Sequence, residues 1–286
     1  MKEVWSSNFE FEMSMMEDAA RMYRYVCIDT EFPGFLRSSS RDASEWEHYA
    51  DLKFNVDNLK VIQLGLTFSD GVNSDTGDTT WQINFREFDP ACDKQVSMSI
   101  ELLRNSGIDL EKNSREGVDM LAFAKRFRGI LRDNRDLKWI TFHGLYDLAY
   151  LVKIITNGKP MPNSLTDFLQ TLACLFRHLY DAKVMAAFSQ GLCGGELSLE
   201  RLGNILKVKR AGASHQAGSD SLLTIGVFWE MKKLLSNLKD EEFEDRLYGT
   251  KCRPLSLCAF RGNDVIVDDR QKLQNVPVFP ARSCVL

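Results

Sequence analysis

The chain has no Cys-x-x-Cys pair, no internal repeat and no run of about 20 apolar residues, the length that a membrane helix needs. Its seven cysteines are odd in number and irregularly spaced, which argues against a disulfide framework or a zinc site and favours reduced thiols inside a cell. The N-terminus lacks a basic region followed by an apolar signal segment. We therefore expect a soluble protein with no membrane anchor.

An excess of basic residues is also missing. The 36 Lys and Arg are outnumbered by 40 Asp and Glu, so the formal net charge is −4, and only a local basic groove remains open for nucleic acid. With 286 residues, 44% of them hydrophobic, the chain can bury a large core. We expect a single domain over residues 1–250 and an irregular or partly disordered tail over residues 251–286.

Short β-prone runs come first in the chain and then alternate with amphipathic runs. Three strands in succession indicate an antiparallel ribbon, and the later alternation predicts an α/β domain with a mixed sheet flanked by helices. Residues 37–51 form a polar connecting segment, and one face of the third strand is expected to be exposed. The expected strands are 25–31, 59–68, 79–88, 137–143 and 180–187, and the expected helices are 5–24, 98–103, 118–131, 146–155, 165–179, 198–206 and 219–235.

The segment from Tyr25 to Glu31, followed by Pro33-Gly34, predicts a buried strand that ends in two carboxylates. Side chains two residues apart on a strand share a face, so Asp29 and Glu31 should point the same way. Such carboxylates repel each other unless a cation lies between them, and hard oxygen ligands suit Mg²⁺ or Mn²⁺. A metal site is the leading hypothesis, and a strand end whose acids face water is the alternative.

Two further acids stand at predicted helix starts. Asp147 follows a strand-to-helix turn, and Asp220 comes five residues after His215. A carboxylate in the first helical turn is favoured by free N–H groups and by the helix dipole, so either acid alone fits an ordinary cap. Four acids and a histidine together, where an open α/β sheet has its binding crevice, favour one shared site.

These strings resemble the motifs of a known enzyme family. Asp-x-Glu on a first strand, Asp after Phe-His-x-x-Tyr, and His-x-x-x-x-Asp are similar to the motifs of the DEDD exonucleases, in their histidine-containing branch. The longer strings DTEFPG (29–34), FHGLYD (142–147) and HQAGSDS (215–221) resemble the Caf/Pop-type deadenylase, the smaller nuclease subunit of the Ccr-Not complex. The resemblance covers roughly residues 4–250.

The resemblance implies a ribonuclease-H-like fold with a mixed five-stranded sheet, and removal of 3′-terminal AMP from the poly(A) tails of messenger RNA in nucleus and cytoplasm. It implies two divalent cations, Mg²⁺ or Mn²⁺, with Asp29 bridging them, Glu31 and Asp220 completing one, and Asp147 binding the other. Two cations about 3.5–4 Å apart suit phosphodiester hydrolysis because they generate a nucleophile and neutralise developing charge. The implied partners are poly(A) RNA, a scaffold subunit and a second deadenylase of the Ccr-Not complex.

His215 is the expected general base, because imidazole titrates near neutral pH and the neighbouring Gly218 suits a group that must move. A loop histidine with a structural hydrogen bond is the alternative. Phe32 either stacks on a terminal base or packs under the sheet, and Lys207-Val-Lys-Arg210 either meets phosphates or forms a solvated helix end.

Two rival functions keep most of these features. The first is a 3′ exonuclease that degrades other RNA or DNA, since selectivity for adenine and ribose depends on pocket shape and on contacts to the 2′-OH. The second is a docking subunit whose site is idle. All five expected site positions are occupied by the required residue types, which counts against an inactive protein.

Overall fold

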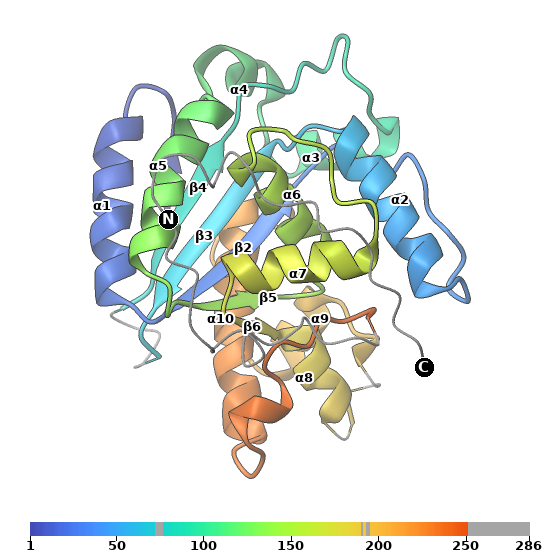
Figure 1. Cartoon of the computed structure of the whole chain (residues 1–286). Coiled ribbons are helices and arrows are strands. Elements are labelled where there is room, and N and C mark those ends of the chain that lie inside the picture. Colours follow the sequence, from blue (N-terminus) through green and yellow to red (C-terminus); the bar gives the residue numbers. More distant parts are fainter. Residues whose placement is uncertain (72–76, 190, 193–194, 251–286) are drawn as a thin grey trace, which may run out of the picture.

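The computed structural model describes residues 1–71, 77–189, 191–192 and 195–250. In this part of the chain one mixed six-stranded sheet lies between two layers of helices (Figure 1). The expected α/β architecture is confirmed, whereas the predicted tail at 251–286 lies outside the described residues and its boundary stays a prediction. In sheet order the strands are β1 (Lys2–Val4), β4 (Thr79–Asn84), β3 (Gln63–Ser69), β2 (Tyr25–Glu31), β5 (Lys138–Thr141) and β6 (His178–Asp181).

The centre of the sheet is the antiparallel ribbon β2-β3-β4, as the succession of strands predicted. Its register sets Asp29 of β2 opposite Gly65 of β3, and Gly65 opposite Gln82 of β4. Strands β1, β5 and β6 join in parallel, with β5 beside β2. The β2 strand is therefore central: its first residues pair with both β3 and β5, whereas Asp29 to Glu31 extend past β5 and pair with β3 alone.

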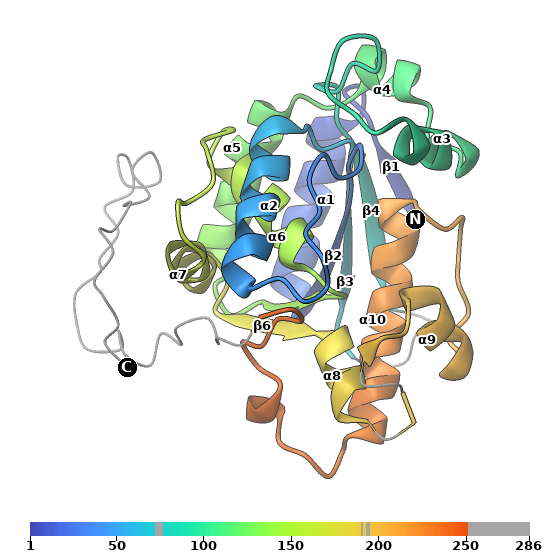
Figure 2. The ribbon, with the colours of Figure 1, turned by 90° about the vertical axis from the view of Figure 1, so that its right-hand side faces the viewer.

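Helices cover both faces of the sheet, as the edge-on view shows (Figure 2). One apolar core lies between the sheet and the helices α1, α2, α5, α6 and α7, and a second lies under α8, α9 and α10. A smaller cluster joins α3 and α4 to the end of the sheet. The helices are α1 (Phe9–Met22), α2 (Glu45–Asn58), α3 (Ser97–Asn105), α4 (Leu110–Glu116), α5 (Met120–Asp133), α6 (Leu145–Ile155), α7 (Leu165–Leu175), α8 (Ala182–Phe188), α9 (Leu199–Ile205) and α10 (Ala217–Leu234), followed by a 3₁₀ turn at Asp240–Glu242.

The sheet has one strand more than the five that were expected. The added edge strand β1 has only three residues, too few to show an alternating pattern. The expected strand at 180–187 was wrong in extent: β6 ends at Asp181, whose side chain accepts the N–H of Lys183 and caps α8. The local helix cap decides the boundary there.

The polar segment 37–51 was also misjudged, because α2 begins inside it. Ser44 and Glu47 form a capping box, a signal for a helix start that the sequence does contain. The buried residues of α2 are Tyr49, Leu52, Asn55 and Val56, a narrow stripe on an otherwise polar helix. Two short helices, α4 and α8, were likewise not expected. Among the described residues, no helix has the length and hydropathy needed to cross a bilayer.

Candidate metal centre and active site

The β2 strand presents Asp29 and Glu31 to the face of the sheet that α10 covers. Cys27, two residues before Asp29 and on the same side of the strand, belongs to the apolar core under α10. Thr30 points to the opposite face, where it contacts the start of α6. The shared face expected for the two carboxylates is therefore the face against which α10 packs.

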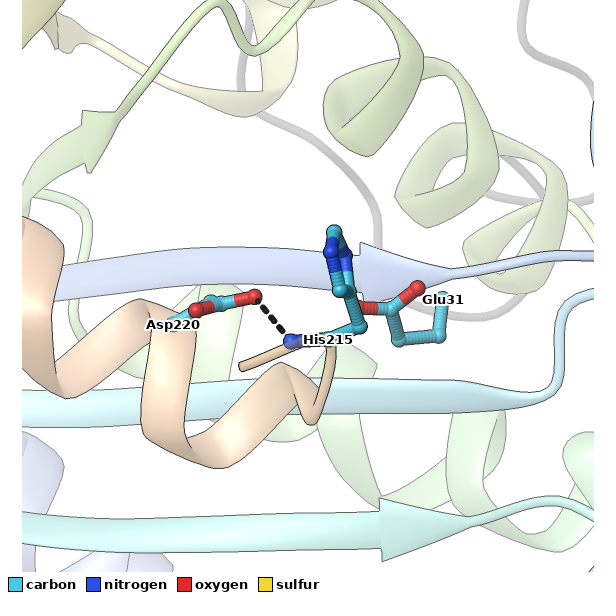
Figure 3. Close-up of side chains that lie close together, drawn as sticks. All are labelled: Glu31, His215 and Asp220. Atoms are coloured by element: carbon cyan, nitrogen blue, oxygen red, sulfur yellow. Dashed lines mark hydrogen bonds between the residues drawn. The ribbon is translucent and has the colours of Figure 1, made fainter. Parts of the chain in front are cut away.

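The start of α10 brings two more site residues to the end of β2. Ligand atoms of Glu31, His215 and Asp220 all lie within 4.8 Å of one another, and the close-up shows the three side chains converging (Figure 3). The backbone N–H of His215 donates to Asp220 Oδ2 at 3.1 Å. His215 has a φ of 60°, so the chain turns sharply just before the helix and leaves the imidazole exposed.

Asp147 approaches from the other side of β2. It lies in the first turn of α6, is 8% exposed, and its Oδ1 accepts hydrogen bonds from the backbone N–H of Thr30 at 2.8 Å and from Thr30 Oγ1 at 2.7 Å. Thr30, which lies between Asp29 and Glu31, therefore holds Asp147 beside these two carboxylates. The structure separates Asp147 from the three groups within 4.8 Å but keeps it close enough for its charge to act on Asp29.

Burial and like charges act together on these carboxylates. Burial, followed by the charges of Asp147, Asp220 and Glu31, raises the pKa of Asp29 well above its ordinary value. Burial and the charges of Asp220 and Asp147 raise the pKa of Glu31 to about 8. Burial raises the pKa of Asp147 to about 7, although the two hydrogen bonds from Thr30 act in the opposite direction. The site is therefore short of positive charge.

Without metal, the protein should lose stability as the pH rises from about 5 to 8. Glu31 and Asp147 have pKa values of about 8 and about 7 in the folded chain, against about 4 in an unfolded chain. Between these values the folded state binds more protons than the unfolded state, so stability falls with rising pH. We expect the Tm in EDTA to fall by on the order of 10 °C across this window.

A Glu31→Gln variant controls for all other titrating groups, because it removes one of these two titrations and leaves the rest. Its curve of Tm against pH should be flatter than that of the wild type. Addition of Mg²⁺ at pH 8 should raise the Tm of the wild type more than that of Glu31→Gln. Parallel curves for the two proteins would show that Glu31 ionises in the folded chain as it does in the unfolded one.

Buried amide side chains of the sheet hold the start of α10 in place. Gln63 Oε1 accepts the N–H of Ala217 at 3.3 Å, and Gln82 Oε1 accepts the N–H of Gly218 at 3.0 Å. Gln216 Oε1 in turn accepts from Gln82 Nε2 at 2.7 Å. These bonds satisfy free N–H groups of the first helical turn and fix the position of the helix that carries Asp220.

Gly65 lets α10 approach the sheet closely. A Cβ at this position would lie 1.9 Å from the carbonyl oxygen of Ala217, a distance that only displacement of the helix could relieve. Because Gly65 is the register partner of Asp29, the helix start is pressed against the strand next to the central acid. The expectation of an exposed face on the third strand was therefore wrong: Gln82 and Asn84 on that face are 2% and 1% exposed.

Three contributors to the site were not recognised for what they do. Arg210 pairs with Asp220 Oδ1 and donates to Ser219 Oγ at 3.1 Å, so it sits on a carboxylate and not in a solvated helix end. Thr30 holds Asp147. The buried glutamines could have been suspected, because an amide within an apolar strand needs internal partners.

The aromatic ring next to Glu31 packs against other rings at the edge of the core. Phe32 is half-buried, and its ring centroid lies 4.7 Å from that of Tyr150, 5.5 Å from that of Tyr146 and 5.2 Å from that of Phe35. Of the two alternatives for Phe32, packing against protein side chains is therefore the one that matches the structure. His143, also at a positive φ of 61°, donates its backbone N–H to Asp181 Oδ1 at 2.8 Å.

The donor set suits divalent cations of the Mg²⁺ class. The carboxylates of Asp29, Glu31, Asp147 and Asp220 supply hard oxygen atoms. Burial and repulsion from neighbouring carboxylates raise the pKa values of Asp29, Glu31 and Asp147, and the charge of Arg210 offsets this only in part at Asp29. Cations would relieve this repulsion. His215 is the one nitrogen donor in the tight group, so it can act either as a ligand or as a base.

A ribonuclease family matches most of the chain. The CAF1 family ribonuclease model matches residues 4–126 and 120–228. The Arabidopsis thaliana protein "Probable CCR4-associated factor 1 homolog 10" is 41% identical over 258 residues, covering 87% of this chain and 91% of the relative. Homolog 7 of the same plant is 40% identical over 260 residues, covering 87% and 92%.

Two solved structures show the same fold at substantial identity. The structure of S. pombe Pop2p in its Mg²⁺- and Mn²⁺-bound form is 36% identical, with a TM-score of 0.78, and covers 87% of this chain and 99% of that one. Yeast CAF1, co-crystallized with the NOT1 MIF4G domain, is 30% identical with a TM-score of 0.70, covering 86% and 96%. The family match and these relatives establish that the chain is a member of the CAF1 family of ribonucleases.

Proposed function

We propose that this protein is a metal-dependent 3′-5′ exoribonuclease that shortens the poly(A) tails of messenger RNA and releases 5′-AMP. The observation that carries the proposal is the convergence of Glu31, His215 and Asp220 within 4.8 Å, beside Asp29 and Asp147. Membership of the CAF1 ribonucleases supports nuclease activity. The names of the CCR4-associated relatives support a place in the Ccr-Not complex.

In this proposal the four carboxylates hold two divalent cations, Mg²⁺ or Mn²⁺. Asp29 is central, Glu31 and Asp220 lie toward α10, and Asp147 lies toward α6. When bound, such cations lower the pKa of a water molecule and neutralise charge on the reacting oxygens. The Mg²⁺- and Mn²⁺-bound form of S. pombe Pop2p is the supporting precedent among the relatives.

The side chains of the protein then have separate tasks. His215 takes the proton of the attacking water, because its imidazole is exposed and lies within 4.8 Å of ligand atoms of Glu31 and Asp220. Thr30 keeps Asp147 oriented, and Arg210 together with the N–H of His215 keeps Asp220 oriented. The buried amides Gln63 of β3 and Gln82 of β4 bind the first N–H groups of α10, so they hold Asp220 at a fixed distance from the carboxylates of β2.

A panel of labelled polymers tests the proposal. We expect 5′-labelled RNA with a 3′ oligo(A) tail to shorten stepwise with Mg²⁺ or Mn²⁺, to release 5′-AMP, and to stay intact in EDTA. Mixed-sequence RNA and DNA of equal length should be degraded more slowly. Equal rates on all three would instead identify a general 3′ exonuclease, and inertness on every polymer would favour a docking subunit.

We also propose that the protein works within the Ccr-Not complex, with a scaffold subunit and a second deadenylase, in nucleus and cytoplasm. The structure of yeast CAF1 with the NOT1 MIF4G domain supports the scaffold partner, and the names of the plant relatives, CCR4-associated factors, support a CCR4 partner, which we propose is the second deadenylase. Affinity purification of the full chain from nuclear and cytoplasmic extracts would test partners and location together.

A further inference from the structure

Phe35 is an exposed aromatic ring beside the candidate metal centre. It follows the end of β2 by four residues and is 51% exposed. Its ring makes edge contacts with Phe32 and Tyr146, at centroid distances of 5.2 Å and 4.9 Å. Phe32 directly follows Glu31, and Tyr146 directly precedes Asp147. Phe35 therefore contacts the residues next in the chain to two site carboxylates.

The segment that carries Phe35 is held rigidly. Asn55 of α2 is fully buried, and its Oδ1 accepts the N–H groups of Leu36 at 2.8 Å and Arg37 at 3.0 Å. Its Nδ2 donates to the carbonyl oxygen of Arg37 at 2.8 Å and to the hydroxyl of Tyr146 at 3.0 Å. One buried amide thus ties the backbone after Phe35 to both α2 and α6, and the exposed ring is presented in one orientation.

Positive charge accompanies the ring. The guanidinium of Arg37 lies 3.6 Å from the centroid of the Phe54 ring, which fixes the side chain at the surface. Arg41 follows four residues later and pairs with Glu196 at 3.6 Å, so Arg37 is the guanidinium that the proposal uses. The segment 35–41 contains two arginines and no acidic residue, in a chain whose net charge is −4. An exposed aromatic next to surface guanidinium groups is the combination that binds single-stranded nucleic acid, through base stacking and phosphate contacts.

We propose that Phe35 is a stacking platform for one of the last two bases of the polynucleotide and that Arg37 contacts its phosphate backbone. The placement rests on adjacency: Phe35 contacts Phe32 and Tyr146, which adjoin Glu31 and Asp147 in the chain, so a strand that leaves the carboxylates on the α6 side reaches this ring. The inference rests on the proposed function for the identity of the polymer. Stacking accepts any base, so Phe35 supplies affinity and alignment, and adenine selectivity has another origin.

Fluorescence of 2-aminopurine tests the platform without requiring hydrolysis. Oligo(A) carrying this base at the last, the penultimate or the sixth position from the 3′ end is titrated with protein in Ca²⁺ in place of Mg²⁺, and its integrity is checked on a gel. We expect quenching at one of the last two positions by the wild type, loss of that quenching in Phe35→Ala, and its return in Phe35→Trp. Affinity should fall about tenfold in Phe35→Ala, the loss expected for one base stack.

Two further variants separate stacking from general surface effects. Phe11→Ala removes a 67% exposed ring on α1, which lies at the other edge of the helical layer from α2 (Figure 1), and should bind like the wild type. Arg37→Ala should keep the quenching but reduce the slope of log affinity against log salt concentration by about 0.7, the change expected for one phosphate contact on a single strand. Circular dichroism of each variant confirms folding.

The outcomes distinguish this inference from the proposed function. If Phe35→Ala quenches and binds like the wild type while the wild type shortens oligo(A), the platform is wrong and the proposed function stands. If quenching depends on Phe35 but no polymer is shortened in Mg²⁺, the platform stands and the proposed function is wrong. Quenching at the sixth position and not at the last two would overturn the placement of the ring.

Discussion

Replacement of Asp29 by Asn should nearly abolish turnover and, at the same time, stabilise the metal-free protein at pH 8. Asp29 lies between the other carboxylates, and the charges of Asp147, Asp220 and Glu31 all raise its pKa. Asn keeps the shape of the side chain and removes the charge. We expect the rate of AMP release to fall by at least about 10³-fold, more than the 10- to 100-fold loss typical when a residue that only orients a metal ligand is changed.

The gain in stability has the same cause as the loss of activity. Removing one of several buried, mutually repelling carboxylates relieves unfavourable charge when no cation is bound, so the Tm in EDTA should rise by a few degrees. Asp18→Asn is the matched control, because that carboxylate lies at the surface of α1, paired with Arg21, with its side chain 61% exposed. It should change neither quantity. An Asp29→Asn protein that is inactive but less stable in EDTA would indicate that Asp29 supports the fold and is not a strained ligand.

His215→Ala should lower turnover by about 10²- to 10⁴-fold, the range typical for loss of a general base, while RNA binding and metal occupancy are retained. The bond from His215 to Asp220 comes from the backbone N–H, so truncation of the ring leaves that bond in place. Single-turnover cleavage, RNA affinity in Ca²⁺ and Mn²⁺ titration measure the three quantities. A loss of Mn²⁺ sites would make His215 a ligand instead of a base.

His143 offers a close control for the His215 experiment. Both histidines are exposed, both have a φ near 60°, and both donate a backbone N–H to an aspartate near the start of a helix. Asn tolerates this backbone conformation better than Ala, so His215→Asn and His143→Asn compare the two rings without added backbone strain. His143→Asn should keep its turnover within a few fold of the wild type, and an equal loss in both variants would remove the special role of His215.

Local sequence patterns were sufficient for the central elements of this protein. The β-prone run ending in Asp29 and Glu31, the three successive strands and the strand-to-helix turn before Asp147 are each marked by alternation and turn residues within the segment itself, so the sequence predicts them. The positions of the four acids and His215 were identified in the same way, because motif spacing is a local property.

Tertiary contacts decided the rest. Gln82 and Asn84 occupy positions that alternation assigns to a solvent-exposed face, but α10 covers that face because Gly65 lets it approach, and the two amides are buried. Likewise Arg210 sits on Asp220 and not in solvent, and Phe35 is the exposed ring while Phe32 packs against other rings. Helix propensity and strand periodicity describe a few neighbouring residues, whereas burial depends on which distant segment packs against them. The sequence alone therefore determined which residues are proposed to carry the chemistry, and only the packing of α10 and α6 against β2 decided how close those residues lie, because that spacing depends on contacts between segments more than 100 residues apart.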